Sequence, residues 1–224
     1  MAEHVICYRR PLVRGNKILI IRLQETGPHS SFSSRPRATL LSSALTIVLL
    51  VLTSPLFLAA QNRALHLDGT PADPFLENAG KPVVLLFVRT DCPISNRYLP
   101  LIERISSQYA AKVAFWLVYP GKTASAERVR QHESDYGYKL HALRDPEHAL
   151  VLEAQVQVTP EAAVFDAHHR LLYHGRIDNL YEDVGRARPA ATTHELADAI
   201  QAALTGKAPP PNTPAVGCYI ADLE

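Results

Sequence analysis

Residues 81–95 read KPVVLLFVRTDCPIS. Positions 83–88 are continuously apolar and rich in β-branched residues, a pattern typical of a strand buried in a parallel sheet. A short polar turn then leads into Cys92 and Pro93. Proline is favoured in the first turn of a helix, because its missing N–H would have no partner there. The stretch therefore predicts a buried strand that runs directly into a helix start at Cys92-Pro93.

Segments with strand and helix periodicity alternate through the rest of the chain. The order predicts an α/β sandwich with a central mixed sheet, forming one domain over residues 63–206. Strands are expected over 113–119, 141–143, 162–165 and 171–174, the last two joined as a hairpin by a polar turn. Helices are expected over 98–109, 124–136, 146–154 and 193–204, with Asp145 as N-cap of the third, Thr192 or Thr193 as N-cap of the last, and Gly206 at its end.

The N-terminal part of the chain has a different composition. Residues 1–37 hold seven Lys or Arg and two Glu, a net charge of +5, and residues 38–62 hold no charged residue. This uncharged stretch is longer than the roughly 18 to 20 residues that cross a bilayer, and basic residues flank it on one side only. It therefore predicts a membrane-spanning helix or a signal sequence. The positive-inside rule then places residues 1–37 in the cytoplasm and the domain after Arg63 outside it, on the periplasmic side. Both a retained anchor and a cleaved signal remain open.

Charge and histidine spacing exclude several classes of function. The formal net charge is +1 for the whole chain, so residues 38–224 carry −4. A mildly acidic domain offers no basic surface for a phosphate backbone, which argues against nucleic-acid binding. The histidines of the domain show no metal-ligand pair such as His-x-x-x-His, so we predict no metal site. No nucleotide-binding or hydrolase motif is present, and no cofactor is expected.

Cys92 is the residue with the clearest chemical signal. Most cysteines are small buried hydrophobic residues, but this one is predicted to lie at a helix N-terminus. Unpaired backbone N–H groups and the helix dipole stabilise a thiolate there, which is the reactive form. Arg89 and Arg97 would add to this stabilisation, and Asp91 would oppose it.

A second signal is the pair Thr159-Pro160, immediately before the predicted hairpin. Proline cannot serve in a central strand and is often cis in a tight turn. This pair, the strand over residues 83–88, the Cys92-Pro-Ile-Ser95 helix start and the last helix form a pattern. The pattern resembles the thioredoxin-like superfamily, in particular its redoxin and thiol-specific-antioxidant group. The resemblance implies that Cys92 is the nucleophile, that the bond before Pro160 is cis and lies beside Cys92, and that Thr159, Pro160, Pro93 and Ser95 contact a peptide-like substrate.

The chain also departs from the patterns of this superfamily. Ser95 stands where thioredoxins have a second cysteine, and Leu86 stands where many of them have a buried acid. Arg89 and Leu85 replace the threonine and proline usual in peroxiredoxins. The resemblance to copper-delivering Sco-type proteins also fails, because Asn96 replaces their second cysteine.

The tail over residues 207–224 is rich in proline and carries Cys218. Only three cysteines are present, and Cys7 falls in the predicted cytoplasmic segment. Cys92 and Cys218 then share an oxidising compartment that permits them to pair, while a free or intermolecular Cys218 remains the alternative.

We therefore expect an extracytoplasmic thiol redox protein that acts with Cys92 and Cys218 on a protein disulfide or a peroxide, with an external thiol or electron donor. The alternative is a non-enzymatic accessory module that assists a membrane or cytochrome complex.

Overall fold

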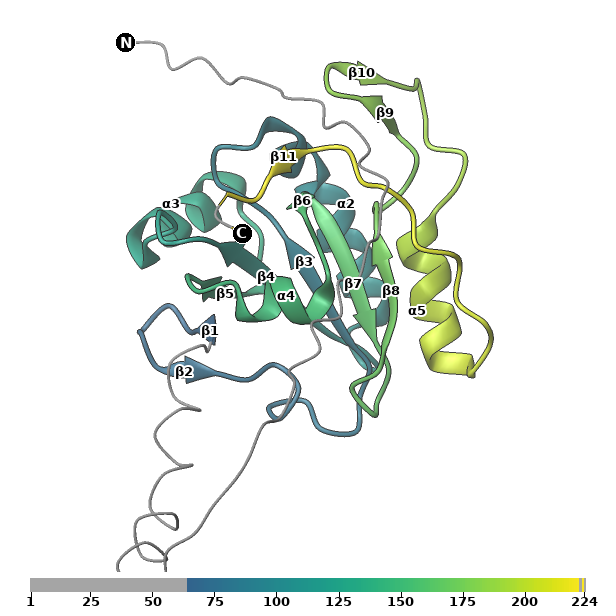
Figure 1. The fold of residues 1–224 in the computed structure, drawn as a ribbon, viewed down its shortest axis with the longest axis horizontal. Coiled ribbons are helices and arrows are strands. Elements are labelled where there is room, and N and C mark those ends of the chain that lie inside the picture. The colour runs from purple at the N-terminus through teal and green to yellow at the C-terminus, as the bar shows by residue number, and fades with distance from the viewer. Residues whose placement is uncertain (1–63, 222, 224) are drawn as a thin grey trace, which may run out of the picture. The chain divides into compact units, whose positions relative to one another are not determined.

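The computed structural model describes residues 64–221 and residue 223 (Figure 1). The predicted cytoplasmic segment 1–37 and the predicted membrane or signal segment 38–62 lie outside these residues. Within the described part, no helix is both long enough and apolar enough to span a bilayer. The elements are β1 (Ala64–Leu65), β2 (Pro71–Ala72), β3 (Val83–Phe87), α2 (Pro93–Tyr109), β4 (Ala114–Pro120), α3 (Ala126–Tyr136), β5 (His141–Asp145), α4 (Ala149–Ala154), β6 (Val158–Thr159), β7 (Glu161–Phe165), β8 (Leu171–Gly175), β9 (Tyr181–Asp183), β10 (Arg186–Ala187), α5 (Glu195–Thr205) and β11 (Cys218–Tyr219).

Seven strands form the central sheet, in the order β2-β1-β5-β4-β3-β7-β8. β3 pairs with β4 in parallel and with β7 in antiparallel orientation, so Leu85 lies opposite both Trp116 and Ala163. β4 and β5 are parallel, and β7 and β8 form the antiparallel hairpin expected from the sequence. The mixed sheet is therefore confirmed, and β3, which leads to Cys92, lies in its interior.

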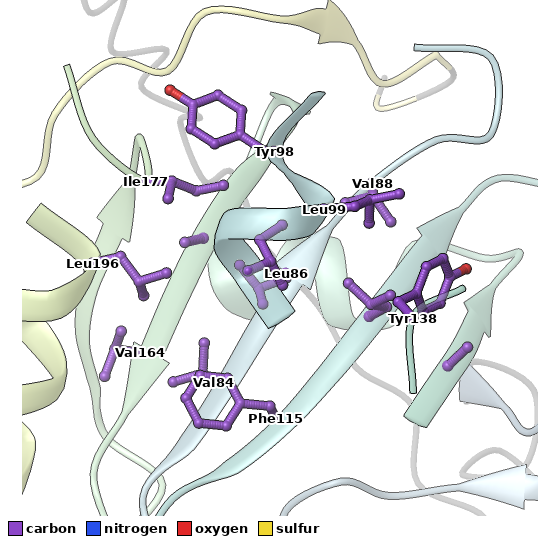
Figure 2. Close-up of a cluster of buried hydrophobic side chains, with 14 of the residues drawn as sticks. Val84, Leu86, Val88, Tyr98, Leu99, Phe115, Tyr138, Val164, Ile177 and Leu196 are labelled. Atoms are coloured by element: carbon purple, nitrogen blue, oxygen red, sulfur yellow. The ribbon is translucent and has the colours of Figure 1, made fainter. Parts of the chain in front are cut away.

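Alternate residues of β3 serve two separate cores, because successive side chains of a strand point to opposite faces. Val84 and Leu86 pack in one core with residues of α2, α3 and α5, among them Leu99 and Leu196 (Figure 2). Leu85 and its alternating neighbours pack in the other core, with residues of α4. Since β3 is buried along its whole length, the sheet holds the start of α2 in a fixed position.

The helices begin at other residues than the expected ranges. α2 begins at Pro93, ahead of residue 98, and α3 at Ala126, after residue 124. In two helices the N-cap differs as well. α4 begins at Ala149, and its N-cap is His148 in the left-handed conformation. Asp145 lies further upstream, at the end of β5, where its carboxylate accepts a hydrogen bond from the Val151 N–H at 2.9 Å. It therefore bonds to the helix without being its N-cap.

The last helix also begins later than expected. α5 starts at Glu195 with His194 as its N-cap. The Thr193 hydroxyl, one of the two expected caps, instead donates to the Glu195 carboxylate at 2.7 Å. The expected end is confirmed, since Gly206 closes the helix with φ of 68°.

Candidate active site

Cys92 is the N-cap of α2, at the point where the chain leaves the buried strand β3. Its backbone is extended, with φ −93° and ψ 110°, and Pro93 occupies the first turn. The Cys92 carbonyl accepts the first helical hydrogen bond, from the Asn96 N–H at 3.1 Å. The Cys92 side chain is 0% exposed. The helix start predicted from the sequence is confirmed, and the sulfur lies beneath other parts of the protein.

Two segments that are distant in the sequence meet the Cys92 sulfur. The thiol donates to the Thr159 carbonyl at 3.2 Å, and the Thr159–Pro160 peptide bond is cis, as expected. The Cys218 Sγ lies 3.1 Å from the Cys92 Sγ, and both residues are free cysteines. The fold therefore brings together the two cysteines and the residue before Pro160.

Backbone pairing places Cys218 at this position. β11 pairs with β6 in antiparallel orientation, with Cys218 opposite Thr159 and Tyr219 opposite Val158. The Thr159 hydroxyl also donates to the Cys218 carbonyl, at 3.4 Å. Cys218 is thus held on the same peptide segment that contacts Cys92.

The two thiols differ in acidity. Burial acts to raise the pKa of Cys92, but hydrogen bonds from the side chain and backbone of Ser95, and from Cys218, outweigh it and lower the pKa below its ordinary value. Burial, the hydrogen bond to Cys92 and the Cys92 charge raise the pKa of Cys218 to about 11. Ionisation of Cys92 ends its bond to the Thr159 carbonyl, which works against the thiolate. Of the two thiols, Cys92 is therefore the more acidic, and Cys218 is the one that donates to it.

Arg89 contributes less to this site than its position in the sequence suggests. Its guanidinium makes two hydrogen bonds to the Asp91 carboxylate, at 3.0 and 2.8 Å, so its charge is compensated nearby. It also donates to the Tyr219 carbonyl at 3.4 Å and so connects the active-site turn to β11. Arg97 is exposed on α2.

The remaining predicted contact residues differ in accessibility. Ser95 and Thr159 are 0% exposed, and Pro160 is also buried, while Pro93 is exposed. Only Pro93 of these four therefore has a surface open to solvent in this conformation. Within the described residues, no group of three or more His, Cys, Asp or Glu side chains is arranged to hold a metal ion.

A buried polar cluster beside the site was missed by the sequence reasoning. Asn96 donates to the Thr90 carbonyl at 3.2 Å and its side-chain oxygen contacts His132 Nε2 at 2.8 Å. On the other side of the ring, His132 Nδ1 lies 2.9 Å from the Tyr119 hydroxyl and 3.2 Å from that of Tyr138. The one available signal was the polar Asn96 one helical turn after Cys92, since the other members come from distant segments.

No protein-family model matches the chain, and no curated protein matches its sequence. Solved structures do match. The hypothetical protein SMc02350 from Sinorhizobium meliloti 1021 is similar at 22% identity and a TM-score of 0.59, over 70% of this chain and 88% of its own. An uncharacterized conserved protein from Geobacillus kaustophilus is similar at 20% identity and a TM-score of 0.59, over 71% of this chain and 87% of its own. A secreted Mycobacterium tuberculosis disulfide oxidoreductase, homologous to E. coli DsbE, is similar at 23% identity and a TM-score of 0.42, over 50% of this chain and 80% of its own.

The fold combines a mixed sheet with a helix that begins at Cys92. The mixed sheet has parallel β4 beside β3 and the antiparallel β7–β8 hairpin on the other side. A cysteine begins the helix after β3, a Thr-Pro pair precedes β7, and α5 packs on the same core as α2. These are the features that the resemblance to the thioredoxin-like superfamily implies, and the likeness to the two solved structures with a TM-score of 0.59 is a likeness of fold.

Proposed function

We propose that this protein is a thiol-disulfide oxidoreductase whose redox centre is the pair Cys92 and Cys218. One observation carries the proposal: the two sulfurs lie 3.1 Å apart although 126 residues separate them in the chain. Ser95 occupies the position at which thioredoxins have their second cysteine, and Cys218 supplies a second sulfur from the C-terminal tail instead.

The chemistry follows from the difference in acidity. The Cys92 thiolate attacks one sulfur of a substrate disulfide, so that a Cys92-to-substrate disulfide forms and the other substrate sulfur leaves as a thiolate. Cys218 then loses its proton to solvent and attacks the Cys92 sulfur, which forms the Cys92–Cys218 disulfide and releases the second substrate sulfur. The substrate gains two electrons and takes up two protons, and the protein loses them. An external dithiol restores the reduced pair by the reverse exchange.

The pKa of Cys218 favours one order of the two steps. The hydrogen bond to Cys92 and the charge of the Cys92 thiolate both help to raise this pKa to about 11. Once Cys92 is joined to a substrate it is neutral, so this contribution disappears and Cys218 ionises more readily. Cys218 therefore attacks after Cys92 has reacted and not before.

Disulfide exchange is preferred over peroxide reduction. Arg89 and Leu85 stand where peroxiredoxins have the threonine and proline of their peroxide site. We also propose that the domain works outside the cytoplasm and is attached or exported through residues 38–62. A reporter fused after Glu224 is expected to be active only outside the cytoplasm, and cytoplasmic activity would overturn this placement.

The function is tested with the full chain and single cysteine variants. Reduction of a disulfide-bonded protein such as insulin is followed with a dithiol as electron donor. C92A should abolish turnover, C218A should accumulate a mixed disulfide on Cys92, and C7A is the matched control that should keep full activity. Full activity of C92A would sink the oxidoreductase proposal and favour the accessory role.

A further inference from the structure

The C-terminal tail does more than carry Cys218. Residues 213–220, here called the strap, run from the end of β8 to the segment before β6. Figure 1 shows this part of the chain passing over the sheet to β11. Between its two ends the strap places the Cys218 sulfur 3.1 Å from that of Cys92. At one end the Thr213 carbonyl accepts from the Arg176 N–H at 3.3 Å, and the Thr213 hydroxyl lies 2.8 Å from that of Tyr173. At the other end the Ile220 N–H donates to the Gln157 carbonyl at 3.0 Å.

Two glycines allow the strap to lie against the domain. A Cβ on Gly217 would come within 2.1 Å of the Thr159 carbonyl oxygen and 3.1 Å of the Pro160 nitrogen. A Cβ on Gly175 would come within 2.3 Å of the Thr213 carbonyl oxygen. These obstacles are backbone atoms, which cannot move aside as a flexible side chain can. A side chain at either position therefore opposes docking of the strap.

The docked strap closes the site. Cys92 and Thr159 are both 0% exposed. A substrate sulfur must reach the Cys92 sulfur to form a bond with it, and in this conformation the strap and the cis-proline segment occupy its surroundings. Reaction of Cys92 with any external substrate therefore requires the strap to move.

The strap has a short ladder and few buried side chains, with Val216 and Cys218 only partly buried against the core. Its ladder with β6 consists of two residue pairs. Ile220 is its one fully buried apolar side chain, 6% exposed, whereas Tyr219 is 76% exposed. Segments with few buried apolar contacts and short ladders open locally at much lower free energy than the core does.

We propose that the strap is a gate that opens to admit the substrate to Cys92 and closes to deliver Cys218 for the second step. This inference rests on the proposed function and adds its regulation. Because one segment both covers the nucleophile and carries the resolving sulfur, closure after the first step places Cys218 against the mixed disulfide. The oxidised pair then fixes the strap in the closed position until an external dithiol reduces it.

Alkylation of the reduced full chain by iodoacetamide separates the covering role from the sulfur. The Cys92 peptide is quantified by mass spectrometry at a pH where the rate no longer rises, so that differences in pKa do not enter. G217V should alkylate faster than wild type by about tenfold or more, because the gate is displaced. In C218A the alkylation of Cys92 should stay as slow as in wild type, because this variant keeps the backbone that covers Cys92. The matched control A208V, at an exposed position of the same tail, should also stay slow.

A chain that ends after Asn212 lacks the strap entirely, and its Cys92 should be alkylated as fast as that of G217V. Equal rates in wild type, G217V and this shortened chain would overturn the gate. Fast alkylation of C218A would also overturn it, because the sulfur and not the strap would then be protecting Cys92. A failure of the proposed function is seen separately, as turnover by C92A, and leaves these rates unchanged.

Discussion

The Cys218 sulfur hydrogen-bonds to the Cys92 sulfur at 3.1 Å, across 126 residues of chain. Thioredoxin-type chemistry with two neighbouring cysteines keeps both sulfurs on one helix. Here the second sulfur arrives on a two-residue strand whose partner is the peptide segment before Pro160. The Cys92 sulfur is therefore carried by α2, which packs in the core, and the Cys218 sulfur by a strand of only two residues, β11.

The first prediction concerns the stability gained when the two cysteines join. Closing a loop of this length should raise the free energy of unfolding by about 4 to 5 kcal/mol in the chain-entropy model, an upper value for real bridges. Guanidinium unfolding of the full chain with and without reductant measures this difference. C218A is the control, and its unfolding curve should not respond to reductant. An identical midpoint for oxidised and reduced wild type would contradict the pairing.

The second prediction concerns the acidity of Cys92. Hydrogen bonds from Ser95 lower the pKa of the Cys92 thiol, so its thiolate persists to lower pH than that of an ordinary cysteine. S95A removes the side-chain bond, and the pKa should rise. Hydrogen bonds to charged groups are worth about 1.5 to 3 kcal/mol, so the ratio of thiolate to thiol at a given pH should fall by about 10- to 100-fold.

Thiolate absorbance in the ultraviolet, taken as the difference from C92A, measures this titration. S107A changes an exposed serine of the same helix and should leave the midpoint where it is. A lower pKa in S95A than in wild type would show that Ser95 does not stabilise the thiolate.

The parts of the site that could be predicted from the sequence are those fixed by local chemistry. The apolar run of β3, the proline after Cys92 and the Thr159-Pro160 pair each specify their own backbone, because turn residues and periodicity act over a few positions. The hairpin of β7 and β8 follows in the same way. These features were sufficient to predict the α/β fold and the helix start at Cys92.

Other features depend on contacts that no local pattern records. Strands of two residues, such as β6 and β11, are too short to show a period. α4 starts three residues after Pro146 because Asp145, at the end of β5, bonds further along the chain, to the Val151 N–H. The closeness of Cys92 and Cys218 likewise depends on how the tail docks, and the length of the tail shows only that such a contact can be reached.

The third prediction concerns the attachment of α2 to the segment after β8. The Tyr98 hydroxyl donates to the Asp178 carboxylate at 2.5 Å, and these two residues are 5% and 4% exposed. Y98F would leave a buried carboxylate without this donor, at a cost of about 1.5 to 3 kcal/mol in the free energy of unfolding. Y136F, at a half-exposed tyrosine of α3, is the control and should unfold like wild type. Equal stability of Y98F and wild type would show that this bond contributes nothing.

The last prediction concerns His132, which is 4% exposed and connects α3 to the active-site turn. Because the Asn96 amide nitrogen donates to Thr90, its oxygen faces the ring, so His132 Nε2 carries the proton and Nδ1 accepts from a tyrosine hydroxyl. H132A leaves these buried partners without the ring and should cost about 2 to 4 kcal/mol in the free energy of unfolding.

The same residue predicts a pH dependence of stability. Burial lowers the pKa of His132 below its ordinary value of 6.5, although Asp135 opposes this shift. The unfolded chain therefore binds a proton more readily than the folded one, and His132 makes stability fall as pH drops below 6.5. Urea unfolding of H132A between pH about 7 and about 5 should lack this part of the decline. H168A, which changes an exposed histidine in the β7–β8 turn, should keep the wild-type slope. A steeper decline in H132A would mean that the folded protein holds this ring in its charged form.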